Sequence, residues 1–400
     1  MSRLDLQAKV LKRALFLFLV LLFFQFLYTP SSLSSREGRS AVKIGIIAPM
    51  SGPFASGGIS MRRSLEIARK ELLDRGGILG RRIDLIAADS EGNVIGARRE
   101  ALRLILKEKV DFLIGAYLSE ETMSIAEIAA NFGKILIIPI SATEEITGLV
   151  SRNPRRYRFI FRTAFSLSRW AEMLGRFIVL RGIKSYAFLG THIRWNRELH
   201  YMLKNYLENK GVTEILSDYY SPKNPVIRPT AFKLARAHQN LVILGDPGRN
   251  SIEAVKSLKA AGFRGTILSI GGTLADERVM RELAPPFEVY AFTACYRGSS
   301  TGATNYFSSF HATYGYEPSG YGDTLPGDAL RVLSEAIESA ESLETEKIIG
   351  FLESHSFKGV AGRYTFSKSH QAGWGPEGEL KGIILHWKGT RYEPAGSADE

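Results

Sequence analysis

"VKIGIIAPMSGPFASGGISMRRSLEIARKELL", residues 42–73, contains the pattern that decides the fold. Its first seven residues are apolar and β-branched for the most part, as expected of a buried strand. A glycine-rich turn follows, and apolar residues then recur at steps of three and four along one helix face, at Met61, Leu65, Ala68 and Leu72. A strand that leads through a short turn into a helix is the first half of a βαβ unit.

The same alternation continues along the chain. Further strand-like runs begin near residues 82, 110, 134, 185, 214, 240, 265 and 288, with helical segments between them. Strands separated by helices predict right-handed crossovers and parallel sheets covered on both faces. We therefore predict an α/β fold of two doubly wound parallel-sheet lobes joined by a hinge. Two late runs, 362–366 and 382–387, have no helix between them and predict a small antiparallel addition.

The length of 400 residues favours two domains, because single cores rarely grow that large. We predict a first lobe of residues 41–162 with 294–356, and a second lobe of residues 163–293 with 357–395. No long Pro- or Ser-rich linker separates them. Short crossing strands should therefore join the lobes, and relative motion is expected.

The first 40 residues have a different composition. Four basic residues precede an apolar stretch, 14–27, that is interrupted only by Gln25 and followed by "SSLSS". This pattern is typical of a secretory signal peptide that is cleaved near Ser34. An uncleaved N-terminal anchor is the alternative, although the apolar stretch is shorter than the about 20 residues that a spanning helix needs. We expect an exported, periplasmic or extracytoplasmic protein.

The charge is basic but does not indicate nucleic acid as a partner. The formal net charge is +11, and it falls to +7 without residues 1–40, which hold six basic and two acidic residues. Five arginines lie between Arg152 and Arg162, and we interpret them as a solvated basic face, since no nucleic-acid motif is present. The single cysteine, Cys295, follows an apolar run and is expected to be a small buried residue.

Enzyme signatures are missing from the sequence. It contains no G-x-S-x-G elbow, no G-x-x-x-x-G-K-[ST] loop and no H-E-x-x-H helix. The glycine-rich segment 51–60 has neither the lysine nor the spacing of a phosphate loop. The seven histidines are scattered. We predict a protein that is not an enzyme and that has no cofactor and no metal site.

Two loops that follow predicted strands carry the candidate binding residues. "GAYLSEET" contains Ser119, and "PISATEE" contains Ser141 and Thr143. Ligands of open α/β sheets bind beside the carboxyl ends of the strands, where helix N-termini offer free N–H groups. The alternative is helix capping, since Ser119 stands at an expected N-cap and Ser141 with Glu144 has capping-box spacing. Both interpretations remain open at this point.

Five motifs in order resemble a known family. They are "IGIIAPMSGPFASGG" (44–58), "RGGILGRRIDLIAAD" (75–89), "FLIGAYLSEET" (112–122), "IPISATEEIT" (138–147) and "FKGVAGRYTF" (357–366). The chain resembles the type I periplasmic binding proteins, in the leucine/isoleucine/valine-binding branch that serves ABC importers. The resemblance covers nearly all of residues 42–387 and implies a protein that binds a small ligand.

The resemblance also implies roles for particular residues. Ser119 matches the serine whose hydroxyl and backbone N–H hold the α-carboxylate of the ligand. Thr143 matches a threonine that contacts both the carboxylate and the ammonium, and Ser141 matches a residue that offers its carbonyl to the ammonium. Ala142 lies between them and is included in the expected site. Trp195 falls where the second lobe offers an aromatic wall, with ordinary packing as its alternative.

The chain departs from the family pattern on the other side of the cleft. The acid that pairs with the ammonium is replaced by Gly271, within "SIGGT". Either Asp246 in "LGDPG" substitutes for it, or the ligand has no α-ammonium, because a buried charge needs a partner. Aromatic residues of the family are also replaced, by Gly57 and Gly327, which predicts space for a larger ligand.

The expected function is that of an extracytoplasmic solute-binding protein of an ABC importer. It would close its hinge on a small carboxylate-bearing ligand, such as a branched-chain amino acid, and deliver it to permease subunits as a monomer. Two alternatives remain open. One is a membrane-anchored ligand-sensing domain of the same fold. The other is a binder of an amide, of urea, or of an aromatic acid that lacks an α-ammonium.

Overall fold

The computed structural model describes residues 40–237, 239–375 and 379–397. The prediction of a signal peptide or anchor falls on residues 1–39, outside the described residues. Among the residues that are described, no helix is both long enough and apolar enough to cross a membrane.

The first lobe is built on a parallel sheet of five strands in the order β2-β1-β3-β4-β5. Its strands are β1 (Val42–Ala48), β2 (Ile83–Asp89), β3 (Phe112–Gly115), β4 (Leu136–Ile138) and β5 (Ile160–Arg162). Its connecting helices are α2 (Ala55–Asp74), α3 (Val94–Leu106), α4 (Ser119–Asn131), α5 (Glu144–Arg152) and α6 (Pro154–Tyr157).

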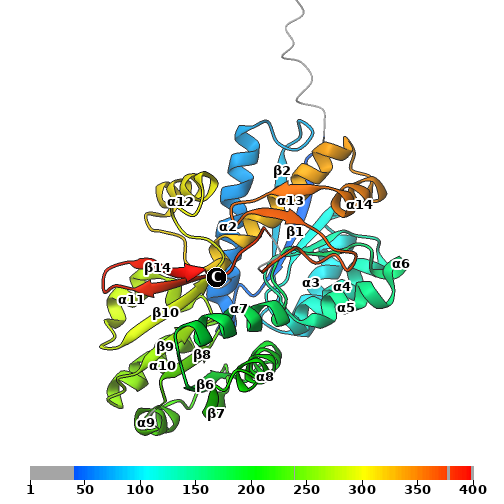
Figure 1. Cartoon of the computed structure of the whole chain (residues 1–400). Coiled ribbons are helices and arrows are strands. Elements are labelled where there is room, and N and C mark those ends of the chain that lie inside the picture. Colours follow the sequence, from blue (N-terminus) through cyan, green and yellow to red (C-terminus); the bar gives the residue numbers. More distant parts are fainter. Residues whose placement is uncertain (1–39, 238, 376–378, 398–400) are drawn as a thin grey trace, which may run out of the picture. The chain divides into compact units, whose positions relative to one another are not determined.

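Helices cover both faces of this sheet (Figure 1). Ile44 and Ile46 on one face of β1 pack in the same core cluster as Met61 and Leu65 of α2. Ile47 points to the other face and packs in the cluster formed with α3 and α4. Because successive residues of a strand point to opposite faces, the run at residues 42–48, apolar except for Lys43, is what a doubly covered strand requires.

The second lobe contains a seven-stranded sheet in the order β14-β13-β10-β9-β8-β6-β7. Its strands are β6 (Ser185–Thr191), β7 (Thr213–Tyr220), β8 (Leu241–Gly245), β9 (Thr266–Ser269), β10 (Glu288–Thr293), β13 (Ile383–Trp387) and β14 (Tyr392–Ser397). β6 to β10 are parallel, whereas β13 pairs antiparallel to β10 and β14 antiparallel to β13. The α/β fold with two parallel-sheet lobes is confirmed, and so is the late antiparallel addition.

Helices also cover both faces of the second sheet. Phe188 packs with α7 (Leu167–Leu180) and α8 (Arg194–Glu208). Its neighbour Leu189 faces the opposite cluster. That cluster is formed with α9 (Arg228–Arg236), α10 (Asn250–Ala260) and α11 (Glu277–Leu283).

The chain returns to the first lobe after β10. There it forms α12 (Thr301–Tyr314), α13 (Leu325–Ala340), α14 (Thr345–Ser354) and the hairpin β11 (Ser356–Lys358) with β12 (Arg363–Thr365). The buried Asp328 of α13 fixes the hairpin, because its carboxylate accepts hydrogen bonds from the N–H groups of Val360 and Ala361 and from the Tyr364 hydroxyl. The motif "FKGVAGRYTF" thus packs on α13, which the sequence predicts to lie in the first lobe, whereas it predicts residues from 357 onward to lie in the second. The lobe boundaries remain a prediction.

Candidate functional site

The two loops predicted from sequence lie side by side at the carboxyl edge of the first sheet, because β3 and β4 are paired neighbours. Ser119 and Ser141 are both fully buried there. The Ser141 hydroxyl donates to the Ser119 Oγ over 3.4 Å. The two loops that carry the candidate residues are therefore direct neighbours.

Capping does not explain these hydroxyls. Helix α4 begins at Ser119 itself, with Leu118 at the N-cap position, so Ser119 lies inside the first turn. Helix α5 begins at Glu144, and its N-cap residue Thr143 makes no side-chain capping bond. Ser141 lies outside the helix, so its expected capping box with Glu144 does not form.

Thr143 connects the two lobes. Its hydroxyl donates to Glu198 Oε2 of α8 over 2.8 Å. In this arrangement the Thr143 Oγ1 can still accept a hydrogen bond, but its own hydrogen is already donated to Glu198. A carboxylate bound by this hydroxyl would have to displace Glu198.

A buried arginine holds the Thr143 loop in place. Arg162 is 1% exposed and donates to the Thr143 carbonyl over 2.6 Å, and also to Gln371. Burial lowers the pKa of Arg162 to about 10, while Glu144 opposes this shift. We had interpreted the arginines between 152 and 162 as solvated, which is wrong for Arg162. Its position in a short strand, among apolar neighbours, was the signal available in the sequence.

Trp195 belongs to a cluster of aromatic residues. It lies in the first turn of α8, is 5% exposed, and meets Trp170 of α7 edge to face, with ring centroids 5.1 Å apart. Trp170 also contacts Phe165 and Tyr321. The indole Nε1 of Trp170 is buried and has no hydrogen-bond acceptor among the described residues.

Asp246 and Gly271 are in close contact across two loops of the second lobe. A Cβ added to Gly271 would lie 1.5 Å from the Asp246 carbonyl oxygen, so this position, where the resemblance implies an acid, has no room for a side chain. The Asp246 carboxylate accepts hydrogen bonds from the Thr191 and Tyr220 hydroxyls and from the Gly248 N–H. Burial nevertheless raises the pKa of Asp246 to about 6.

Three contacts between the lobes could not be foreseen from sequence, because they depend on how distant elements meet. The Tyr117 hydroxyl donates to the Pro247 carbonyl over 2.8 Å. The N–H of Arg194 donates to Glu120 Oε1 over 3.1 Å, and the Arg194 guanidinium pairs with Glu145 at 2.6 Å.

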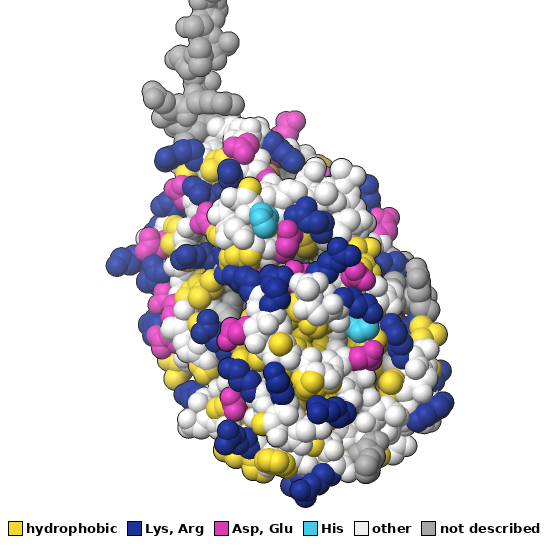
Figure 2. Space-filling view, turned by 90° about the vertical axis from the view of Figure 1, so that its left-hand side faces the viewer, with side chains coloured by type: hydrophobic (Ala, Val, Ile, Leu, Met, Phe, Trp, Pro, Cys, Tyr) yellow, Lys and Arg dark blue, Asp and Glu magenta, His cyan; other side chains and the backbone are white. Residues whose placement is uncertain are grey.

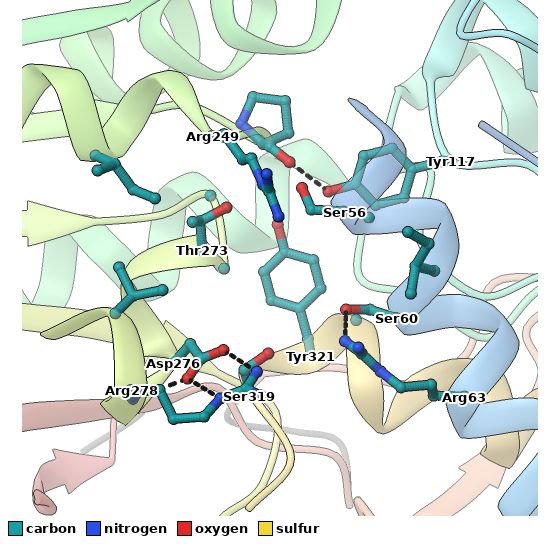
Figure 3. Close-up of a pocket in the computed structure, with 18 of the residues that line it drawn as sticks. Ser56, Ser60, Arg63, Tyr117, Arg249, Thr273, Asp276, Arg278, Ser319 and Tyr321 are labelled. Atoms are coloured by element: carbon teal, nitrogen blue, oxygen red, sulfur yellow. Dashed lines mark hydrogen bonds and ion pairs between the residues drawn. The ribbon is translucent and has the colours of Figure 1, made fainter. Parts of the chain in front are cut away.

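A cavity of about 480 Å³ opens beside these contacts. Residues of α2, the β3–α4 loop and the second-lobe loops line it, and Figure 3 shows them surrounding the Tyr321 phenol. Gly271 lines this cavity. The other predicted site residues, Ser119, Ser141, Ala142, Thr143, Trp195 and Asp246, are not among the residues that line it.

The extra space expected at two glycines is not found. A Cβ on Gly57 would lie 2.2 Å from the Tyr117 ring, so Tyr117 fills the volume beside this glycine. Gly327 lies where α13 packs closely on α2, with the Ser64 carbonyl oxygen 2.9 Å from the position of a Cβ. The expectation of a larger pocket from these two positions is wrong.

A family model described as periplasmic binding protein matches residues 41–375. The chain belongs to the periplasmic binding proteins. The resemblance predicted from the five motifs is thereby confirmed, including its leucine/isoleucine/valine-binding branch, which relatives of that name support.

Two relatives of this periplasmic binding protein are named for the amino acids that they bind. An amino acid binding protein of Pseudomonas aeruginosa is 24% identical over 361 residues, covering 88% of this chain and 92% of the relative. A leucine-, isoleucine-, valine-, threonine- and alanine-binding protein of the same organism is 23% identical over 339 residues, 82% of this chain and 86% of the relative.

A solved structure has the same fold. It is a solute-binding protein of an ABC transporter from R. palustris in complex with benzoate. It superimposes with a TM-score of 0.80 at 20% identity, over 90% of this chain and 97% of that chain.

Within the described residues of this periplasmic binding protein, no group of three or more His, Cys, Asp or Glu side chains is arranged to hold a metal ion.

Proposed function

We propose that this protein is the exported solute-binding subunit of an ABC importer, and that it closes on a small carboxylate-bearing ligand between its lobes. The observation that carries the proposal is the buried pair of Ser119 and Ser141 hydroxyls beside the N-terminus of α4, neither of which caps a helix. Charge-assisted hydrogen bonds at a helix N-terminus suit an anion. The solutes named for the relatives, amino acids and benzoate, share a carboxylate.

In this proposal Ser119 holds the carboxylate with its hydroxyl and backbone N–H. Thr143 joins it after releasing Glu198, while Ser141 and Ala142 supply backbone groups. Trp195 provides an apolar wall from the second lobe. Cross-lobe contacts such as Tyr117 with Pro247 support closure around a ligand.

The test is calorimetry on the double variant Ser119→Ala with Thr143→Ala, using a ligand found by thermal-shift screening of amino acids and carboxylic acids. Hydrogen bonds to a charged group contribute about 1.5–3 kcal/mol each, so affinity should fall by at least about 100-fold. Ser124→Ala, which removes a hydroxyl from the same helix, is the control and should bind normally. Unchanged affinity in the double variant would remove the site assignment.

A second candidate, a ligand without an α-ammonium, is favoured by the second lobe. The Asp246 carboxylate is already occupied by three donors, and Gly271 has no space for an acid. Glu198 accepts a hydrogen bond from Thr143, but Arg194 Nε also donates to it over 2.6 Å. Comparing leucine with 4-methylpentanoate, which differs only in lacking the ammonium, separates the candidates. Tighter binding of 4-methylpentanoate supports the second one.

A sensing role and a transport role use the same ligand site and differ in the N-terminal segment and in the partner. We propose transport, with ABC permease subunits as partners and a monomeric, periplasmic binding protein. Mass spectrometry of the natural protein addresses the alternative. A start near Ser35 supports release by cleavage, whereas an intact Met1 supports an anchored sensor.

A further inference from the structure

The cavity in Figure 3 contains an arginine without a partner. Arg249 precedes α10, and its side chain forms neither an ion pair nor a hydrogen bond with any described residue. Figure 3 shows it extending into the cavity. The charge of this guanidinium is therefore available to a ligand.

The two other arginines of the cavity are engaged. Arg63 donates to Asp323 and Ser60. Arg278 donates twice to Asp276, and its guanidinium lies 3.3 Å from the centroid of the Tyr316 ring. These contacts hold both side chains in the cavity wall. Arg249 is therefore the arginine of the lining whose guanidinium can bind a ligand.

A second unsatisfied donor lies on the opposite wall. The Ser56 hydroxyl of α2 is buried, lines the cavity, and has no hydrogen-bond partner among the described residues. Glu282 is the one acid in the lining besides Asp276, and it is exposed on α11. A free guanidinium with a nearby hydroxyl suits a carboxylate or a phosphate, which accept several hydrogen bonds at once.

The cavity is adjacent to the proposed carboxylate site. Tyr117 lines it and lies two residues before Ser119, the first residue of α4, and Gly271 lines it from the second lobe. Figure 2 shows the face that lies on the left of Figure 1, where α11 and α12 are drawn, and Lys and Arg side chains gather across it. Such a field attracts anions toward the cavity.

We infer that Arg249 and Ser56 form a subsite for a second anionic group of the ligand. The natural solute is then a dianionic acid, either a dicarboxylate or a carboxylate that also carries a phosphate, and not a simple amino acid. This inference rests on the proposed function, because the first carboxylate is the one assigned to Ser119.

The experiment compares matched probes on the purified protein by thermal shift and calorimetry. The probes are straight-chain dicarboxylates, monocarboxylates with the same number of carbons, benzoate with 4-carboxybenzoate, and inorganic phosphate alone. We expect at least one dicarboxylate to bind about tenfold more tightly than its monocarboxylate match. Arg249→Gln should abolish this difference and leave monocarboxylate binding unchanged.

Lys256→Gln is the matched control, because it removes the same charge from an exposed position of α10 outside the cavity lining. It should keep the dicarboxylate preference. Equal weakening of both probe classes in Arg249→Gln overturns the inference, as does the lack of any dicarboxylate preference. Arg249-dependent binding of phosphate without such a preference also overturns it, since the subsite would then hold an independent anion. The proposed function fails separately, if Ser119→Ala with Thr143→Ala leaves monocarboxylate binding intact.

Discussion

At the residue scale, two glycines of this protein lie where another part of the chain occupies the space that a side chain would need. Tyr117 occupies the space beside Gly57, so an aromatic ring enters the cleft from the loop between β3 and α4 and not from the first glycine loop. Gly271 lets the Asp246 backbone approach so closely that no Cβ fits between them. Both glycines were visible in the sequence. The groups that fill the space beside them were not, because Tyr117 and Asp246 lie 60 and 25 positions away along the chain.

Gly271→Ala tests the close approach directly. Overpacking typically costs about 1–3 kcal/mol, and we expect the upper end because the obstacle is the Asp246 backbone and not a flexible side chain. Gly272→Ala is the control. A Cβ there would make only an ordinary van der Waals contact with the Tyr321 ring, 3.9 Å away, and a positive φ of 86° costs about 1–2 kcal/mol. Urea denaturation should therefore show the larger loss for Gly271→Ala, and equal losses would contradict the crowding argument.

At the element scale, helix α4 combines a proposed anion site with a buried acid one half-turn further on. Glu121 is fully buried, accepts one hydrogen bond from the Leu118 N–H, and has no partner for its Oε1 among the described residues. Burial raises the pKa of Glu121 to about 7. The sequence indicated only that acids in the first turn of a helix are favourable, and burial was the missing information.

The raised pKa of Glu121 makes stability dependent on pH. The folded protein binds more protons than the unfolded chain between about pH 4.5 and 7, so this group's contribution is complete below that range and is lost as the pH rises through it. At one pKa unit per 1.36 kcal/mol, the loss is on the order of 3 kcal/mol. Glu121→Gln should therefore be more stable than the wild type at pH 8 and flatten the decline between pH 5 and 7.

Glu127 of the same helix offers a control of opposite sign. Burial opposes ionisation there, but hydrogen bonds from Tyr157 and Arg156 and nearby arginine charges together outweigh it and lower the pKa of Glu127. Its contribution is present at neutral pH and is lost as the pH falls through its lowered pKa. Glu127→Gln should thus be less stable than the wild type at pH 7. An unchanged pH profile in Glu121→Gln would contradict the assignment.

Strand prediction succeeded where the sequence pattern was long and failed where it was short. Residues 42–48 were placed correctly as β1 because a seven-residue run that is apolar except for Lys43 leaves little ambiguity. The three residues of β5 were missed, since Arg162 interrupts their apolar character and pairs only with residues distant in sequence. The candidate site followed the same rule: Ser119 and Ser141 were proposed from their loop positions, whereas the contacts of Glu198 and Arg194 required the fold.

At the scale of the whole molecule, charge pairs link the two lobes. Arg194 of α8 pairs with Glu145 of α5, and its N–H contacts Glu120 of α4. The neighbouring glutamates raise the pKa of Arg194 further above its ordinary value. Such pairs weaken with increasing ionic strength when they are partly exposed to water.

Arg194→Gln should therefore shift the ligand-free protein toward open forms. We expect a larger radius of gyration in small-angle X-ray scattering, and the wild type should approach the variant at high salt. Arg197→Gln, an exposed change three residues along the same helix, should have no such effect. If Arg194→Gln scatters like the wild type at low salt, this pair does not contribute to closure.

The aromatic cluster has an optical consequence. Trp170, Trp195 and Trp374 are three of the four tryptophans, and all three contact it. Indole emission depends on polarity and on neighbouring rings, and Trp195 reaches this cluster from the second lobe at the first turn of α8. The protein thus carries an intrinsic fluorophore at the place where its lobes meet, so solute capture should be readable from tryptophan emission without any attached label.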